Sequence, residues 1–467
     1  MKILYAVSEC MPFCATGGLA EVAGSLPKAI KKYRNDVRVI MPLYKVVKEK
    51  YGSKLEHVSS CEVKLAWRQS YCGLYKYEES GIIYYFVEND YYFNRDKLYS
   101  HYDDGERFAF FSKAIFDCLE MVEFYPDIIH ANDHQTALVP IYLDHFKKSG
   151  RFLSTNSVFT IHNIEYQGRY DFAILGDVFD LDDEYRNVVD LDGQINLMKG
   201  AIVTSNLITT VSPKYAREIT TPEFGRGLDK IIDMYRFKLI GILNGINYEF
   251  YNPEKDKEIH KYSLANINAK YENKSEFQKE FGLLQDKDYA LVSLISRLVG
   301  HKGVDILLEK IDEIMAKPIE LVVLGLGEKQ YEDAFRYFEW KYNGRLVFIN
   351  DFNTALSKRL YASSDLFLMP SKTEPCGLSQ MIACRYGTLP IVHATGGLFD
   401  SITCENGFRF DDYSGDALVG AINSAVDLYY DVDKRMAHIA NAMNSDFTWK
   451  ASAKVYFNEY KRLKGEF

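Results

Sequence analysis

Short apolar runs recur along the whole chain, and most are followed by a stretch whose apolar positions have helical spacing. Runs of this length, bounded by turn residues, predict buried strands. They lie at residues 1–9, 37–41, 128–129, 157–161, 207–213, 238–245, 290–295, 319–324, 346–349, 366–369 and 389–393. Predicted helices lie at 22–33, 107–122, 304–316, 381–386 and 450–463. Strands that alternate with helices predict an α/β protein with two doubly wound, Rossmann-like parallel-sheet domains.

Two regions interrupt this alternation. Residues 43–105 alternate apolar and polar positions and carry many Tyr, which indicates short strands and a decorated loop region. The polar run at 254–274 is typical of a linker and a solvated helix, and it indicates a domain boundary near residues 240–255. We therefore predict domains at 1–245 and 246–447, followed by a C-terminal helix in 448–467.

Length and composition limit the class of protein. A chain of 467 residues is too long for one core, and 47% hydrophobic with 26% charged residues is typical of a soluble globular protein. The formal net charge of -9 disfavours nucleic acid and anionic membranes as partners. No apolar run approaches the roughly 20 residues of a membrane helix, and the N-terminal run is a strand rather than a signal peptide.

The eight cysteines show no paired C-x-x-C spacing. This pattern favours free thiols in a reducing cytoplasm and disfavours structural zinc.

One carboxylate lies at a predicted strand-to-helix junction. Glu374 belongs to the segment 370–380, between the strand at 366–369 and the helix at 381–386, and Gly377 next to it allows close approach of a ligand to the backbone. Ligands bind at such junctions in open α/β sheets, and a helix N-terminus there binds anions. The alternative is a punctuated loop with a solvated glutamate.

The first half carries a glycine pair and two polar strand ends. Gly17 and Gly18 lie between the first strand and its helix, where backbone amides either face a phosphate or permit close packing. Asp133 and His162 each follow a predicted strand. A histidine at such a point is either a structural imidazole or part of a site, and the presence of two polar strand ends favours the site.

The second half supplies cations at strand ends. Arg297 and Lys302 follow the strand at 290–295, and a second glycine pair, Gly396 and Gly397, follows the strand at 389–393. Two cations with backbone amides can take the charge of a departing diphosphate, which suits a nucleotide-activated substrate bound between two domains. The chain lacks G-x-G-x-x-G after its first strand, which excludes a dehydrogenase of that kind.

Together these motifs resemble a known family. Residues 15–22, 130–138, 158–170, 208–219, 296–303 and 365–398 are similar to bacterial glycogen synthases and plant starch synthases. The resemblance implies a retaining α-glucosyltransferase of the GT-B fold, with two domains facing a deep cleft and a C-terminal helix that crosses back to the first domain. It implies ADP-glucose as donor substrate, ADP as product and an α-1,4-glucan such as glycogen as acceptor. It makes no prediction of oligomeric state.

The resemblance also implies the roles of the candidate residues. Arg297 and Lys302 would hold the donor diphosphate, and Glu374 would bind the transferred glucose. His162 would hydrogen-bond that glucose through its backbone carbonyl or its ring, and Asp133 would lie near acceptor and sugar. The remaining residues implied to contact the donor are Gly17, Gly18, Asn163, Asn244, Phe352, Cys376, Gly377, Leu378, Thr395, Gly396 and Gly397. Phe352 would stack on adenine where the family commonly has Tyr.

No metal and no cofactor are implied, because the two cations take that electrostatic role. The acidic run at 180–183 resembles a metal-binding triplet but follows no strand, and we interpret it as solvated.

The chain departs from the family pattern at several positions. Ala15 replaces the lysine of the family's Lys-Thr-Gly-Gly-Leu loop, and loss of a charge-assisted contact to phosphate costs about 1.5–3 kcal/mol. The segment 130–135 reads His-Ala-Asn-Asp-His-Gln in place of His-Ala-His-Asp-Trp-His, so Asp133 persists without its usual neighbours. His393 stands where Arg is common and Asn247 where Asp is usual. These changes weaken donor affinity more than they affect the transfer step.

Alternatives to a glycogen synthase remain open at this point. One is a related transferase that uses UDP-glucose or another acceptor, and another is a weakly active or non-catalytic glucan-binding paralogue. Retention of configuration is compatible with double displacement or with front-face attack. We also expect the two domains to close around the donor, with hinges near residues 245 and 448.

Overall fold

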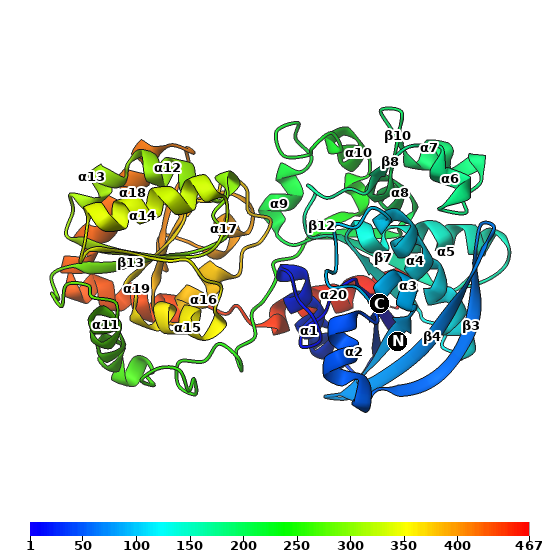
Figure 1. Cartoon of the computed structure of the whole chain (residues 1–467), viewed down its shortest axis with the longest axis horizontal. Helices are drawn as coiled ribbons and strands as arrows, with labels where there is room; N and C mark the ends of the chain where they lie inside the picture. The colour runs from blue at the N-terminus through cyan, green and yellow to red at the C-terminus, as the bar shows by residue number, and fades with distance from the viewer. Residues whose placement is uncertain (467) are drawn as a thin grey trace. The chain divides into compact units, whose positions relative to one another are not determined.

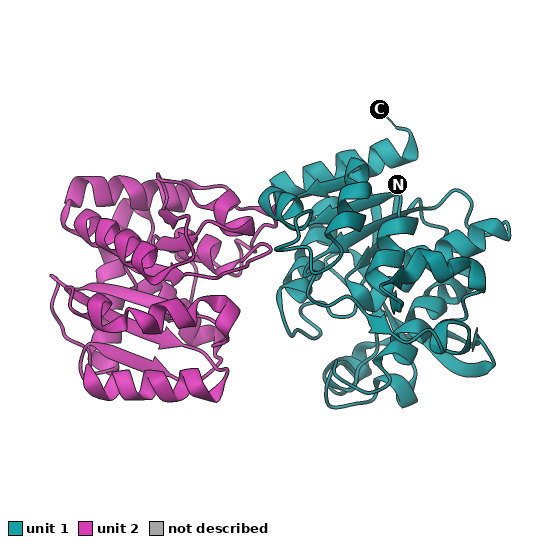
Figure 2. Cartoon of the chain, turned by 90° about the horizontal axis from the view of Figure 1, so that it is seen from above, with its two compact units in different colours: residues 1–242, 449–467 teal, residues 243–448 magenta. Residues whose placement is uncertain are grey.

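Two separate sheets organise the chain (Figure 1). The computed structural model describes residues 1–466. Residues 1–242 and the C-terminal segment from Trp449 form unit 1, and residues 243–448 form unit 2 (Figure 2). The predicted boundary at 245/246 therefore lies at 242/243. Inside unit 2, the two connecting segments run side by side, because Ile246 pairs with Thr448 and its N–H donates to Phe447 O at 2.8 Å.

The sheet of unit 1 has the order β12-β11-β7-β6-β1-β2-β5-β4-β3. Its seven strands from β12 to β5 are parallel, whereas β4 pairs antiparallel with both β5 and β3. The strands are β1 Lys2–Ala6, β2 Asp36–Pro42, β3 Glu56–Leu65, β4 Arg68–Glu79, β5 Ile82–Glu88, β6 Ile128–Asn132, β7 Asn156–Ile161, β11 Leu207–Thr210 and β12 Leu239–Gly241. A small sheet is formed by β8 Arg169–Tyr170, β9 Asp190–Leu191 and β10 Gln194–Asn196.

The helices of unit 1 bury apolar faces against this sheet and against one another. They are α1 Gly18–Lys31, α2 Lys45–Tyr51, α3 Asp90–Phe93, α4 Asp104–Met121, α5 Leu138–Lys148, α6 Ile174–Asp177, α7 Arg186–Val189, α8 Leu197–Thr204, α9 Pro213–Glu218, α10 Asp229–Met234 and α20 Trp449–Lys464. The last helix, red in Figure 1, packs beside α1, where Phe457 stacks on Tyr33 with ring centroids 4.7 Å apart. The predicted return of the C-terminal helix to the first domain is therefore present.

Unit 2 is built on a fully parallel sheet with the order β15-β14-β13-β16-β17-β18. Its strands are β13 Ala290–Ile295, β14 Ile319–Leu324, β15 Leu346–Ile349, β16 Leu366–Met369, β17 Leu389–His393 and β18 Phe408–Phe410. Its helices are α11 Ala269–Glu280, α12 Val304–Glu309, α13 Ile311–Met315, α14 Lys329–Lys341, α15 Thr354–Ser363, α16 Ser379–Arg385, α17 Gly396–Ser401, α18 Gly415–Tyr430 and α19 Val432–Asn444. Nearly continuous apolar strands suit a sheet buried on both faces.

The region 43–105 differs from the prediction of short strands. Strands β3 and β4 are 10 and 12 residues long and form an antiparallel ribbon at the edge of the unit 1 sheet. The edge strand β3 is largely exposed, so its apolar and polar residues alternate only weakly. The sequence therefore gives little indication that the strand is 10 residues long. The predicted helix at 304–316 is also interrupted, because α12 ends at Glu309 and α13 begins at Ile311.

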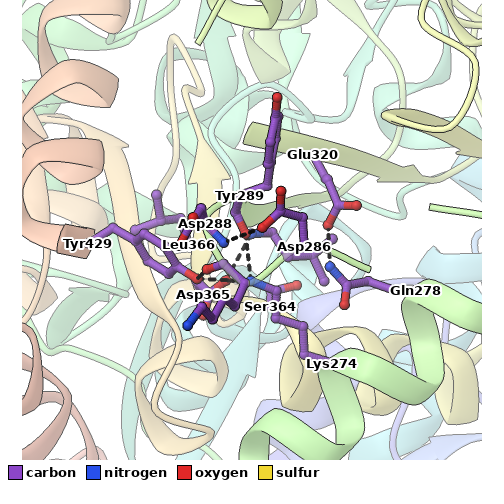
Figure 3. A network of polar contacts seen from close by, with 12 residues as sticks. Lys274, Gln278, Asp286, Asp288, Tyr289, Glu320, Ser364, Asp365, Leu366 and Tyr429 are labelled. Atoms are coloured by element: carbon purple, nitrogen blue, oxygen red, sulfur yellow. Dashed lines mark hydrogen bonds and ion pairs between the residues drawn. The ribbon is translucent and has the colours of Figure 1, made fainter. Parts of the chain in front are cut away.

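Helix α11 contradicts the prediction of a solvated helix at 254–274. Four of its polar side chains are buried: Lys270, Asn273, Lys274 and Gln278. The Lys274 ammonium contacts the Asp365 carboxylate at 2.7 Å and donates to Tyr289 O at 2.6 Å (Figure 3). Gln278 donates to Glu320 at 2.7 Å. These polar side chains can be buried because each has a hydrogen-bond partner. The partners of Lys270, Lys274 and Gln278 come from distant segments, whereas Asn273 bonds His260.

In the part of the chain that the structure describes, residues 1–466, no helix is both long enough and apolar enough to cross a membrane.

The buried ion pair of α11 gives a stability prediction. Replacing Lys274 by Met leaves the Asp365 carboxylate buried without its cation, and we expect the free energy of unfolding to fall by about 3–5 kcal/mol. The matched control is Lys434→Met, which removes the 2.8 Å pair with Asp431 from a lysine side chain that is 73% exposed. That change should leave the free energy of unfolding nearly unchanged, because an exposed ion pair is screened by water. Urea unfolding measures both, and equal losses would contradict this account.

Candidate functional site

The candidate residues of unit 2 gather where β13 and β16 end. These strands are neighbours in the sheet, so the loops after them emerge together. Lys302 closes a short 3₁₀ turn after β13, and Glu374 lies in the loop between β16 and α16. The Lys302 ammonium contacts the Glu374 carboxylate at 2.6 Å, and Ser371 Oγ donates to the same carboxylate oxygen at 3.1 Å. The Glu374 carboxylate is therefore buried and paired with the ammonium group of Lys302.

The glycine pair after β17 packs directly on the loop that carries Glu374. Gly396 has φ of +43°, and a Cβ there would lie 1.9 Å from Glu374 O. A Cβ on Gly397 would lie 2.2 Å from Cys376 O, while its own N–H donates to Glu374 O at 3.1 Å. Only glycine permits this contact between two backbones. The pair therefore fixes the main chain at Glu374.

Other predicted donor-binding residues surround the same loop. Cys376 is buried, and burial raises the pKa of its thiol to about 12, so the thiol is neutral. Gly377 has φ of +70°, Leu378 precedes α16 as its N-cap residue, and Thr395 is the buried N-cap residue of α17. Asn244 is buried with its Oδ1 unpaired by any described residue, which leaves an acceptor for a ligand.

Two predicted residues of unit 2 lie at its surface. Arg297 is exposed in the loop that begins after β13, on the same side of the sheet as Lys302. The Phe352 side chain is 82% exposed in the loop between β15 and α15. An aromatic ring and a cation that contact no buried partner are available for a ligand.

In unit 1, Asp133 joins the ends of β6 and β7. Its carboxylate accepts hydrogen bonds from the backbone N–H of His162 at 2.7 Å and of Asn163 at 3.3 Å. Asp133 itself has a positive φ of 55°. Burial raises the pKa of this carboxyl to about 7, against the two amides that lower it. Asp133 thus fixes the chain at His162 and Asn163.

The His162 side chain is partly buried and neutral. Burial lowers the pKa of its imidazole to about 3. Its Nε2 lies 2.9 Å from Asn132 Oδ1. The ring therefore carries no charge at neutral pH, and one of its nitrogens is held by a side chain that the sequence did not single out.

The first glycine pair lies in open space. A Cβ on Gly17 or Gly18 would meet nothing within 4 Å, and helix α1 begins at Gly18. The preceding Thr16 donates to the buried Glu9 carboxylate through its N–H at 2.5 Å and its hydroxyl at 2.8 Å. Packing does not demand these glycines, and their contact with a phosphate stays a prediction. Ala15 beside them is exposed.

Sequence reasoning gave no role to three residues that hold the predicted ones, although it placed Asn132 beside Asp133 at a strand end. Glu9 orders the loop before Gly17, Asn132 contacts His162, and Ser371 donates to Glu374. Each lies next to a predicted strand end or site loop, which is the signal that could have found them.

The acidic run at 180–183 is solvated in part, as predicted. Asp180 pairs with Lys113 at 2.8 Å, and Asp182 is exposed. Among the described residues, Asp182 comes close to His145 and Glu184 in a cluster that could hold a metal ion, but Lys148 already pairs with Glu184 at 3.1 Å. A lysine in that position opposes a metal ion.

The backbone contact at Gly396 gives a second prediction. Gly396→Ala forces the Glu374 carbonyl to move, and we expect a loss of about 2–4 kcal/mol in the free energy of unfolding. The control is Gly420→Ala in helix α18, where a Cβ meets nothing within 4 Å. That change should stabilise the protein by about 0.5–1 kcal/mol, because alanine favours a helix. Urea unfolding that shows no difference between the variants would refute the close contact.

The histidines at the strand ends of unit 1 give a prediction on pH. Burial lowers the pKa of His134 to about 4 and that of His162 to about 3. Between pH about 6.5 and 4 the unfolded chain binds protons that the folded chain does not, so stability falls as the pH falls.

The variant His134→Gln removes one of these groups. We expect it to reduce the loss of unfolding free energy between about pH 7 and pH 5 by about 1–2 kcal/mol. Urea unfolding at both pH values measures this. An unchanged pH dependence would show that His134 titrates alike in both states.

Comparison with known proteins covers the whole chain. Residues 2–234 match the family model of the starch synthase catalytic domain, and residues 275–444 match that of glycosyl transferases group 1. A glycogen synthase of Clostridium botulinum strain Alaska E43 is 43% identical over 99% of both chains. A glycogen synthase of Ligilactobacillus salivarius is 44% identical over 99% of this chain and 100% of its own.

Solved structures agree. The catalytic domain of starch synthase IV from Arabidopsis thaliana, bound to ADP and acarbose, is 33% identical, with a TM-score of 0.90 over 100% of this chain and 99% of its own. A sucrose-phosphate synthase from Thermosynechococcus elongatus shares the fold, with a TM-score of 0.61 at 16% identity over 99% of both chains. The predicted GT-B fold and glycosyltransferase class are confirmed, and the chain belongs to the glycogen synthase and starch synthase family of glycosyltransferases.

Proposed function

We propose that the protein transfers glucose from ADP-glucose to the non-reducing end of an α-1,4-glucan with retention of configuration. The observation that carries the proposal is the contact between Lys302 and Glu374 at 2.6 Å, at the carboxyl ends of β13 and β16. A sugar diphosphate has a negatively charged diphosphate, which a cation can bind, and a neutral sugar, whose hydroxyl groups can donate to a carboxylate. One cation placed against one buried acid suits both parts. The relatives named glycogen synthase, and the ADP bound by the Arabidopsis enzyme, support this donor.

The two cations of unit 2 would act on the leaving group. The lysine ammonium has three donors, and Glu374 occupies one of them, so Lys302 can contact a phosphate oxygen without leaving the carboxylate. Arg297 at the end of the same strand adds a bidentate donor. Together they neutralise the charge that develops on ADP as the glycosidic bond breaks. The proposal therefore includes no metal ion and no cofactor.

Glu374 would hold the transferred glucose. Its buried carboxylate accepts hydrogen bonds only, which suits sugar hydroxyl groups. The buried Asn244 Oδ1, which no described residue pairs, adds a second acceptor within the same unit. Phe352 would stack on the adenine. The predicted phosphate contact of the glycine pair is not available at Gly397, because its N–H already donates to Glu374 O at 3.1 Å.

The strand-end cluster of unit 1 would serve the sugar and the acceptor. His162 is neutral, so it can hydrogen-bond a hydroxyl group without placing a second cation beside the glucose. Asp133 would act mainly by fixing the backbone at His162 and Asn163, since its carboxylate is already bonded to both amides. Gly17 and Gly18 would offer open backbone to a donor phosphate.

UDP-glucose is a second candidate donor, because Ala15 alters the loop before Gly17 in which the family has a lysine. The side chain is exposed beside Gly17 and carries no charge, so the cation that the family places there is missing. We expect this loss to weaken donor binding whichever nucleotide is bound. The protein would work in the cytoplasm, in keeping with eight cysteines that form no disulfide.

Glucose transfer to glycogen from ADP-glucose and from UDP-glucose tests the proposal. We expect transfer from ADP-glucose in the wild type and its loss in Glu374→Ala, with unchanged activity in the control Glu405→Ala, which removes an exposed carboxylate of the same unit. Faster transfer from UDP-glucose would favour the second donor. No transfer from either donor would refute the proposal.

The variant Ala15→Lys tests the missing cation. Because a charge-assisted contact to phosphate contributes about 1.5–3 kcal/mol, we expect KM for ADP-glucose to fall by about 10-fold or more. The control Ala15→Met adds a side chain of similar length without charge and should leave KM within about threefold. An equal effect of both substitutions would show that charge is not the missing feature.

A further inference from the structure

Asn132 is the last residue of β6, and its side chain contacts Tyr5 of β1 and His162, which follows β7. Its side chain is completely buried and makes four hydrogen bonds. Oδ1 lies 3.0 Å from the Tyr5 hydroxyl and 2.9 Å from His162 Nε2. Nδ2 donates to Ala6 O at 3.1 Å and to His130 O at 3.2 Å. Every polar group of this amide therefore has a partner.

These partners fix the direction of the amide. Backbone carbonyls only accept hydrogen bonds, so the NH2 end of Asn132 must face Ala6 O and His130 O. The carbonyl oxygen must then face Tyr5 and His162. Since a carbonyl oxygen only accepts, Nε2 of His162 must carry the proton that lies between them.

The other ring nitrogen of His162 then has a defined chemistry. In a neutral imidazole with a proton on Nε2, Nδ1 is an acceptor. No group of the described chain donates to Nδ1. We propose that Asn132 is a positioning residue that holds His162 as the Nε2–H tautomer, so that Nδ1 accepts a hydrogen bond from a hydroxyl group of the transferred glucose. The part about glucose rests on the proposed function.

Tyr5 supplies a second hydrogen bond to the carbonyl oxygen of Asn132, an amide that the two backbone carbonyls already orient. Its hydroxyl is buried, and burial raises the pKa well above the usual value, so Tyr5 stays protonated and donates to Asn132. Its ring packs edge-on against His130 with centroids 4.6 Å apart. His130 in turn lies 2.6 Å from the hydroxyl of Tyr460 on α20. A fully bonded buried network of this kind resists rotation of the amide.

The tautomer is directly measurable. Long-range nitrogen–proton NMR couplings in the full-length protein with ¹⁵N-labelled histidine distinguish the two tautomers, and the signal of His162 is the one missing in His162→Gln. We expect the Nε2–H tautomer in the wild type near neutral pH. The Nδ1–H tautomer or an imidazolium in the wild type overturns the proposal.

Variants then test the positioning role. In Asn132→Ala the ring loses its acceptor, and we expect a mixture of tautomers and a kcat for ADP-glucose lowered by about 10–100-fold, with KM within about threefold. The control Tyr5→Phe removes the other donor to Oδ1 and leaves the contact with His162. It should keep the Nε2–H tautomer and a kcat within about threefold of the wild type.

Asn132→Asp gives a third readout. A carboxylate at this position favours a proton on both ring nitrogens, so we expect His162 to become an imidazolium and transfer to fall. Wild-type kcat together with a single Nε2–H tautomer in Asn132→Ala would overturn the proposal. If the wild type transfers no glucose, the proposed function fails instead, while the tautomer in the free protein still decides the role of Asn132.

Discussion

The ion pair between Lys302 and Glu374 depends on close contact between two backbone segments, the Glu374 loop and the glycine pair Gly396 and Gly397. The Glu374 loop can hold its carboxylate at 2.6 Å from the ammonium because Gly396 and Gly397 allow the next loop to pack directly against it. Burial gives the pair its strength, since opposite charges attract more in a medium of low polarity. The parallel sheet sets the meeting point, because β13 and β16 are neighbours and their loops emerge at one edge.

In unit 1, hydrogen bonds rather than an ion pair hold the candidate residues. Asp133 bonds the amides of His162 and Asn163, and Asn132 bonds the ring of His162. Strand ends that carry single polar side chains are thereby linked into one network. Glu374 and His162 are each held by a neighbour, Ser371 and Asn132 respectively, that makes no proposed contact with substrate. The precision of the site therefore depends on residues that sequence motifs do not mark.

The parts of the fold with strong local signals were predictable. Apolar runs located β13 and β16, and the junction after β16 located Glu374. Helix α11 was wrongly predicted as solvated, because its lysines are polar in the sequence while their partners lie far along the chain. Lys274, for example, pairs with Asp365, 91 residues away. Asn132 escaped for the same reason, since its partner Tyr5 lies 127 residues away.

The central claim is that the cations of unit 2 bind the diphosphate of the donor. Calorimetric titration of ADP into the wild type, Lys302→Met and the exposed-lysine control Lys434→Met tests it most directly. The account predicts that ADP binds the wild type and the control alike, and that affinity falls by about 10–100-fold in Lys302→Met. Equal affinity of ADP for all three proteins would contradict it.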